Sequence, residues 1–187
     1  MSVRDVFQRI VSAMDRADIE YMLSGSFAAA YYGVARATQD IDFVIDASIP
    51  QLQSFVASLP GTEYYADLDS AIEAHQRQSM FNVIDQAAGW KIDFIIRKSR
   101  PYSQEEFRRR DQVTLHGIAL SIATAEDAII SKLEWAKLAE SPRQIEDVAA
   151  ILRTRGNTLD RPYLQKWIAE LGLGEVWKKA TLIAESP

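Results

Sequence analysis

The stretch Asp40-Ile41-Asp42-Phe43-Val44-Ile45 decides the fold, because it combines an apolar strand with two carboxylates. Successive side chains of a strand point to opposite faces, so Asp40 and Asp42 share one face while the other face is apolar. Two carboxylates this close repel each other, and a bound cation removes that cost. Oxygen ligands of this kind suit Mg²⁺ or Mn²⁺. The alternative is that both aspartates only line the exposed face of a half-buried strand.

A second stretch, Lys91-Ile92-Asp93-Phe94-Ile95-Ile96, nearly repeats this pattern, with Asp93 standing where Asp42 stands. If the two strands are neighbours in one sheet, Asp93 joins the carboxylate face and three aspartates converge. Such a triad can hold two cations, one activating an attacking hydroxyl and one stabilising a pyrophosphate leaving group. We therefore predict that Asp40, Asp42 and Asp93 are both the metal ligands and the catalytic residues.

A turn upstream of these aspartates is a candidate phosphate site. Residues 19–23 predict a short strand, and Ser24-Gly25-Ser26 then turns the chain into a helix that ends near Gly33. Gly25 lets the backbone approach a ligand, and the free N–H groups of a helix start favour an anion to which Ser26 can donate. Ser26 is equally well explained as an N-cap that needs no ligand. Together with the aspartates, the turn favours nucleotidyl transfer from a triphosphate.

Several short motifs also carry a family resemblance. They are the run 23–45 with Arg36 and Thr38 ahead of the aspartates, the later Asp93, the stretch Ala123-Thr124-Ala125-Glu126-Asp127 leading to Lys132, and Ser141-Pro142-Arg143-Gln144-Ile145-Glu146-Asp147. The Gly-Ser turn and the aspartates resemble the nucleotidyltransferase fold of the DNA polymerase beta superfamily. The whole set is similar to small bacterial abortive-infection type nucleotidyltransferases, some of which are toxins. The last motif departs from the pattern at Gln144, where related chains often carry an acidic residue.

The resemblance implies an NTP substrate with Mg²⁺ or Mn²⁺, and transfer of NMP to a hydroxyl of an RNA such as tRNA, of a protein or of a small molecule. Gly25 and Ser26 would then hold the β and γ phosphates. Lys132 would reach the phosphates as a flexible point charge, and its alternative is a surface lysine paired with a nearby acidic residue, Asp127 or Glu134. Arg36 would add positive charge, or else fix the loop before the aspartate strand. A toxin-like role would bring an antitoxin-like protein partner.

The expected fold class is α+β, a nucleotidyltransferase fold with a mixed sheet, helices on one face and a C-terminal helical region. We predict a core at 1–122, including an amphipathic N-terminal helix at 3–17, and a helical region at 123–187 packed on that core. The core has a helix after Pro50, an irregular segment at 61–78, and a hairpin that joins 80–84 to 90–96. The helices after residue 124 break at Ser141-Pro142, Gly156-Asn157 and 172–174.

Composition narrows the function classes. The chain has 187 residues, no cysteine and two histidines, which excludes disulfides and argues against thiolate or multi-histidine metal sites. No run approaches the ~18 apolar residues of a membrane span, and the N-terminus has no signal-peptide pattern, so we expect a cytoplasmic protein without a membrane partner. A net charge of −5 argues against a surface that binds nucleic acid throughout.

Local basic clusters leave one alternative open. Arg97, Lys98 and Arg100 follow the Asp93 strand, and residues 108–110 are three consecutive arginines near the end of a predicted helix. They fit a solvated face with cations at a helix C-terminus, or a small landing patch for an RNA acceptor. The protein as a whole also has an alternative: a non-catalytic nucleotide-binding module or a toxin-antitoxin interaction module. Three clustered carboxylates favour catalysis over these.

Overall fold

The computed structural model describes residues 2–34 and 37–186. The chain forms two compact units, the first made of Met1–Ser24 and Ala37–Ile122 and the second of Gly25–Arg36 and Ala123–Pro187. The sequence predicts a boundary after residue 122, and the structure also separates 25–36 from the core sequence that surrounds it. The chain therefore leaves the first unit directly after Ser24 and returns to it at Ala37.

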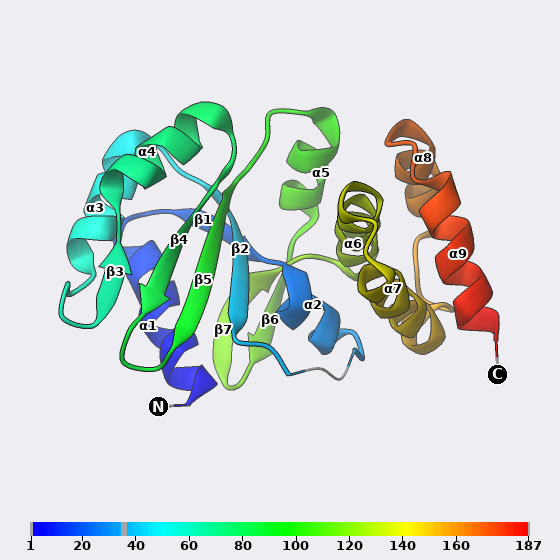
Figure 1. The fold of residues 1–187 in the computed structure, drawn as a ribbon, viewed down its shortest axis with the longest axis horizontal. Coiled ribbons are helices and arrows are strands. Elements are labelled where there is room, and N and C mark those ends of the chain that lie inside the picture. The colour runs from blue at the N-terminus through cyan, green and yellow to red at the C-terminus, as the bar shows by residue number, and fades with distance from the viewer. Residues whose placement is uncertain (1, 35–36, 187) are drawn as a thin grey trace. The chain divides into compact units, whose positions relative to one another are not determined.

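A seven-stranded mixed sheet organises the first unit, with the strand order β3-β4-β5-β2-β1-β7-β6 (Figure 1). The strands are β1 (Glu20–Leu23), β2 (Asp40–Asp46), β3 (Tyr64–Ala66), β4 (Met80–Asp85), β5 (Trp90–Ile96), β6 (Asp111–Leu115) and β7 (Ile118–Ile122). The pairs β2–β5 and β1–β7 are parallel, and the other neighbours are antiparallel. This mixture, with helices on the sheet, confirms the α+β class.

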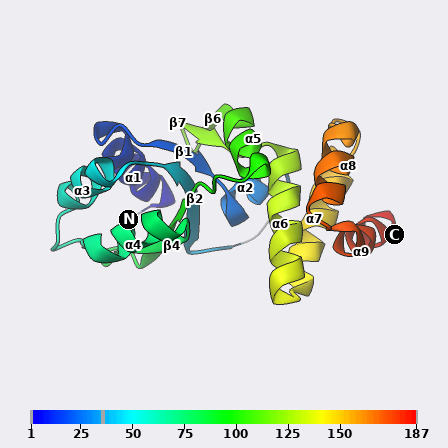
Figure 2. The same ribbon diagram turned by 90° about the horizontal axis from the view of Figure 1, so that it is seen from above.

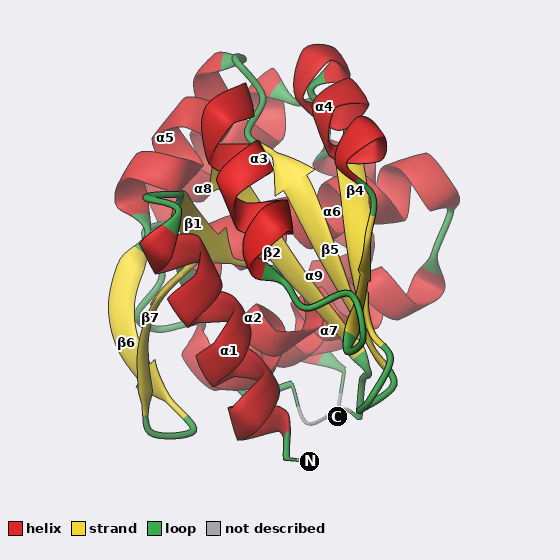
Figure 3. Ribbon diagram, turned by 90° about the vertical axis from the view of Figure 1, so that its left-hand side faces the viewer, coloured by secondary structure: helices red, strands yellow, loops and turns green. Residues whose placement is uncertain are grey.

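Helices cover the apolar face of the sheet. The first unit contains α1 (Val3–Arg16), α3 (Ile49–Ser58), α4 (Leu68–Arg77) and α5 (Pro101–Arg109), and Figure 3 shows α1, α3 and α4 in front of the strands. Phe43 of β2 lies edge-on to Phe7 of α1, and Phe94 of β5 lies edge-on to Phe55 of α3. All four rings are fully buried. The apolar side of each aspartate strand is thus the core of this unit.

The segment 61–78 is not irregular, and that prediction is wrong. It contains β3, whose Tyr64 pairs with Asp85 of β4, and the ten-residue helix α4. Asp67 caps α4 by accepting a hydrogen bond from the Asp69 N–H, as expected for an N-cap aspartate. A strand of three residues is too short to show a period, and the buried positions of α4 are only alanines, so hydrophobic periodicity does not reveal either element.

The second unit is helical. It contains α2 (Gly25–Tyr31), α6 (Ala125–Ala139), α7 (Pro142–Arg155), α8 (Arg161–Glu170) and α9 (Gly174–Glu185), and α7 packs against both α6 and α9 (Figure 2). The three predicted breaks between these helices are confirmed. Two hydrogen bonds anchor the segment after α2: the Tyr32 hydroxyl donates to the Ala123 carbonyl, and the Thr154 hydroxyl donates to the Tyr32 carbonyl. The segment 25–36 therefore belongs to the helical unit.

Across residues 2–34 and 37–186, every helix is too short or too polar to cross a membrane.

A buried carboxylate joins α1 to the β4–β5 hairpin. Asp85 is fully buried, accepts a hydrogen bond from Arg9 at 2.5 Å, and accepts two more from the N–H groups of Ala87 and Ala88 at 3.1 and 2.9 Å. Arg9 also lies 3.2 Å from Glu63, at the start of the neighbouring β3 strand. A single carboxylate therefore satisfies both the hairpin turn and the helix arginine.

We expect Asp85→Ala to lower the free energy of unfolding by about 2 to 3 kcal/mol, because it leaves two turn amides and a half-buried guanidinium short of an acceptor. Urea unfolding of the purified protein measures this loss. The matched control is Glu73→Ala, which breaks the exposed Glu73–Arg77 pair and should cost at most about 0.5 kcal/mol. Equal costs for the two variants would show that Asp85 is not a structural anchor.

Candidate functional site

The parallel pairing of β2 with β5 brings the aspartate strands together. In its register Asp42 lies opposite Asp93, and Asp40 lies opposite Lys91. Paired residues of neighbouring strands project from the same face, so all four side chains leave the sheet on the face opposite to the phenylalanine core. The prediction that the two strands are neighbours, with Asp93 on the carboxylate face, is confirmed by this register.

The strands on either side extend this polar row. Asn82 of β4 lies opposite Asp93, and the Ser24 N–H donates a hydrogen bond to the Asp42 carbonyl at 2.8 Å. Across the sheet, the row therefore runs from the amide of Asn82 through the carboxylates of Asp93 and Asp42 to Ser24, the residue that follows β1. The neighbouring positions on the apolar side, Phe43 and Phe94, are fully buried and hold the two strands in this register.

Lys91 is the functional candidate that sequence reasoning missed. Its ammonium donates a hydrogen bond to Asp93 Oδ2 at 2.7 Å. This bond raises the pKa of Lys91, and the negative charges of Asp93, Asp40 and Asp42 add to the increase. The available signal was strand periodicity, because Lys91 stands two residues before Asp93 and therefore shares its face.

Asp93 is the buried member of the triad. The residue is only 6% exposed, whereas Asp40 is exposed and Asp42 half-buried. Its Oδ2 atom binds Lys91, and its Oδ1 atom is buried without a hydrogen-bond partner among residues 2–34 and 37–186. Leaving a buried carboxylate oxygen unpaired is costly, so this atom is suited to accept a cation or a proton from a ligand.

The aspartates do not form a ready metal cluster. Within the described residues, no three His, Cys, Asp or Glu side chains are grouped closely enough to hold a metal ion. The donor set nevertheless fits Mg²⁺ or Mn²⁺, because it consists of carboxylate oxygens and includes the unpartnered Oδ1 of Asp93. One oxygen of this donor set is already bound by the ammonium of Lys91.

The other predicted site residues belong to the second unit. Gly25 begins α2 with φ at 60°, in the left-handed region that glycine adopts at no steric cost, and Ser26 follows it as a half-buried residue. Arg36 lies outside the described residues. The phosphate roles of these three residues stay predictions.

One of the two interpretations of Lys132 required a lysine at the surface, but the structure buries this residue. The residue is 3% exposed, and its ammonium lies 2.7 Å from Asp147 Oδ2 and 3.0 Å from Gln144 Oε1. The alternative named Asp127 or Glu134 as partner, whereas these two contacts come from α7. Gln144 thus brings no charge to this pair but contributes a hydrogen-bond acceptor.

Three arginines of the two basic clusters have acidic partners. Arg97 pairs with Asp46, Arg110 pairs with Glu20, and both lie over the ring of Phe107. Arg108 makes a further pair within α5 with Glu105. Arginines neutralised in this way have less charge to offer to phosphates, so these pairs favour the interpretation as a solvated face over a landing patch for RNA.

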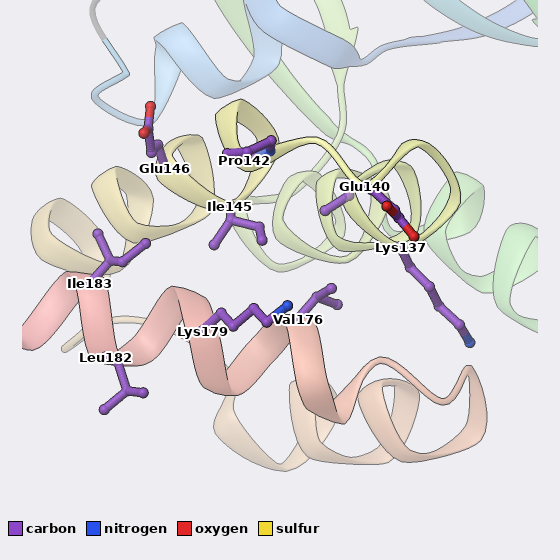
Figure 4. Close-up of a pocket in the computed structure, with 10 residues that line it drawn as sticks. Lys137, Glu140, Pro142, Ile145, Glu146, Val176, Lys179, Leu182 and Ile183 are labelled. Atoms are coloured by element: carbon purple, nitrogen blue, oxygen red, sulfur yellow. The ribbon is translucent and has the colours of Figure 1, made fainter.

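The second unit also has a cavity of about 780 Å³ between α6, α7 and α9 (Figure 4). Val176 and Lys179 of α9 and Ile145 of α7 are among its lining residues, and the lining carries none of the predicted site residues. Lys137, which also lines it, donates to the carbonyls of Leu171 and Gly172. The cavity therefore mixes apolar and charged side chains, and of the charged ones Lys137 already binds the segment after α8.

Comparison with solved structures identifies the fold. The antibiotic-resistance factor ANT(2'')-Ia in solution matches with a TM-score of 0.52 at 14% identity, over 96% of this chain and 88% of its own. The lincosamide antibiotic adenylyltransferase LnuA, lincomycin-bound, matches with a TM-score of 0.52 at 13% identity, over 81% of this chain and 96% of its own. The chain has the nucleotidyltransferase fold.

A third structure agrees with this fold. The antigenic nucleotidyltransferase-like protein from Paracoccidioides brasiliensis matches with a TM-score of 0.51 at 14% identity, over 92% of this chain and 89% of its own. No protein-family model and no curated protein sequence matches the chain. The similarity to these structures therefore lies in the backbone arrangement, at sequence identities of 13% to 14%.

We expect Lys132→Met to lower the free energy of unfolding by about 3 kcal/mol, because it leaves Asp147 buried without its cation. The double variant Lys132→Met/Asp147→Leu should recover most of this loss, since two apolar side chains replace the whole ion pair. Thermal or urea unfolding of the two variants tests the coupling. A double variant less stable than the single one would contradict the interpretation that the pair itself carries the effect.

Proposed function

We propose that this protein is a metal-dependent nucleotidyltransferase that transfers NMP from an NTP to a hydroxyl acceptor. The observation that carries the proposal is the pairing of Asp42 with Asp93, with Asp40 on the same face, in a chain that has the nucleotidyltransferase fold. The near-repeat of the two strands in the sequence supports the same conclusion, because both strands place a carboxylate at the same level of one sheet.

The proposed reaction assigns the carboxylates different tasks. The acceptor hydroxyl oxygen attacks the α-phosphorus of the NTP, the bond between the α-phosphorus and the bridging oxygen breaks, and pyrophosphate leaves. Asp93 takes the proton of the hydroxyl, because its Oδ1 is buried and has no hydrogen-bond partner in the part of the chain that the structure describes. Asp40 and Asp42 are the more accessible pair and would hold the cations together with Asp93.

Mg²⁺ or Mn²⁺, when bound, would neutralise the charge that develops on the phosphoryl oxygens and the leaving group. The residues of the second unit complete the proposal. Gly25 and Ser26 would hold the β and γ phosphates, and Lys132 would supply a further positive charge. Arg36 would act in the same region or fix the loop before β2. These assignments rest on the sequence motifs and on the left-handed conformation of Gly25.

The acceptor is the open part of the function. Among proteins of similar fold, LnuA is a lincosamide antibiotic adenylyltransferase and ANT(2'')-Ia is an antibiotic-resistance factor, which makes ATP and a small-molecule hydroxyl the first pair to test. An RNA such as tRNA or a protein hydroxyl is an alternative acceptor. A toxin role, an antitoxin-like partner and a cytoplasmic location rest on the sequence resemblance and composition alone.

We expect NTP to bind well only in the presence of Mg²⁺ or Mn²⁺, because the carboxylates otherwise repel the triphosphate. Asp42→Asn should weaken Mg·NTP affinity at least about tenfold while leaving the fold intact. Calorimetric titration of ATP with and without Mg²⁺ measures both effects. The control is Asp46→Asn in the same strand. The Asp46 carboxylate pairs with Arg97, so this change should leave the Mg·NTP affinity unchanged. Equal NTP affinity with and without the cation would count against the site.

The transfer itself is tested by incubating the protein with each labelled NTP, Mg²⁺ or Mn²⁺ and cell extract, and then identifying the labelled product. Asp93→Asn should retain Mg·NTP binding but lose transfer by about 10²- to 10⁴-fold, because a proton acceptor acts mainly in the transition state. Mg·NTP affinity and the rate of transfer are both measured on the same preparation of each protein.

The same experiment separates the enzyme from a nucleotide-binding module. The ion pair between Lys91 and Asp93 favours such a module, because the ammonium compensates the charge of the proposed base. If the wild-type protein binds Mg·NTP tightly but labels nothing with any NTP, either cation and several extracts, the transferase proposal is wrong and the binding module replaces it.

A further inference from the structure

The ammonium of Lys91 occupies the part of the carboxylate face that a cation would need. The ammonium lies 2.7 Å from Asp93 Oδ2, and Lys91 as a residue pairs with Asp40 in the strand register. Among the described residues, the other oxygen of Asp93, Oδ1, is buried without a hydrogen-bond partner. A divalent cation that binds Asp93 through Oδ2 must therefore take this oxygen away from the lysine, and Oδ1 stays available as a proton acceptor.

The two partners of this ion pair differ in their freedom to move. The Asp93 side chain is 8% exposed and projects from a central strand, whereas the Lys91 side chain is 42% exposed. A lysine has a long flexible stem and a strongly hydrated ammonium, so Lys91 can return to water without any movement of the backbone. Asp93 has no such alternative.

We propose that Lys91 is a positioning residue that holds Asp93 while the site is empty and is displaced by the divalent cation, so that it sets the metal affinity of the site. This inference rests on the proposed function, since it assumes that Asp93 is a metal ligand. An ammonium and a divalent cation repel each other when they share one carboxylate. Lys91 therefore compensates the charge of Asp93 before a cation binds, and it raises the cation concentration that the site requires.

The test uses Mn²⁺ alone as the probe, with binding measured by the loss of its free-ion paramagnetic resonance signal. Lys91→Met, which removes the charge but keeps the length, should bind Mn²⁺ about tenfold more tightly than the wild-type protein. Lys91→Arg keeps the charge and should retain the wild-type affinity. Lys98→Met removes an exposed lysine just after the same strand and should change nothing. Lys91→Gln replaces Lys91→Met if that variant does not fold.

Thermal unfolding gives a second measurement on the same proteins. Without divalent cations, Lys91→Met should unfold at a lower temperature than the wild-type protein, because Asp93 then loses its buried partner. Mn²⁺ should raise the unfolding temperature of Lys91→Met more than that of the wild-type protein, since tighter binding stabilises the folded state more. A merely structural lysine would lower stability but leave the Mn²⁺ affinity as it is.

Unchanged or weaker Mn²⁺ binding by Lys91→Met, with clear binding by the wild-type protein, would overturn the inference and leave the proposed metal site intact. Failure of every variant, the wild-type protein included, to bind Mn²⁺ at millimolar concentration would overturn the metal site itself, and the inference with it. The two failures are therefore distinguishable in one titration series.

Discussion

The structure depends on the parallel pairing of β2 with β5. Because residues of paired strands project from the same face at the same level, this pairing places Asp42 beside Asp93 and Phe43 beside Phe94. One face of the pair is then the centre of an aromatic core covered by α1 and α3, and the other face is charged. A shift of the register by one residue would bury the aspartates, so the core packing also determines the geometry of the site.

Burying part of an acidic face without a ligand has a cost, and the chain offsets it with its own lysine. Lys91 stands in the strand position that corresponds to Asp40 in the neighbouring strand, so the near-repeat of the two strands differs by a change of charge sign. Among the described residues, no three carboxylates are grouped closely enough to hold a metal ion. The acidic face thus carries a cation of its own, the ammonium of Lys91 on Asp93.

The division of the chain has a further consequence for the site. The sheet unit holds the three aspartates and Lys91, whereas the helical unit holds Gly25, Ser26 and Lys132. Within the helical unit, Lys132 is fixed by Asp147 and Gln144 of a different helix. Removing one partner of a buried ion pair is costly, whereas replacing the whole pair by apolar side chains is often neutral. The contacts with Asp147 and Gln144 therefore constrain any second role of the lysine.

The sequence by itself determined the two aspartate strands, the hairpin before β5, the helical character after residue 124 and the α+β class. These features follow from local periodicity, which needs only the alternation of apolar and polar side chains within one segment. It also indicated that Asp93 would join the first two aspartates, because the two strands share one pattern. Local periodicity did not reveal the short strand β3 or the alanine-lined helix α4, since neither has enough large apolar residues to show a period.

Only the tertiary structure decided which charges meet. Three ion pairs join Lys91 to Asp93, Arg9 to Asp85 and Lys132 to Asp147. They depend on rotamers and on which strands or helices are neighbours, and the last two pairs join residues that are far apart in sequence. Propensity and spacing say which face a side chain lies on, but an ion pair forms where packing brings two charges within a few ångströms. The sequence therefore predicted the carboxylate face, and the fold decided that a lysine of the same strand would neutralise it.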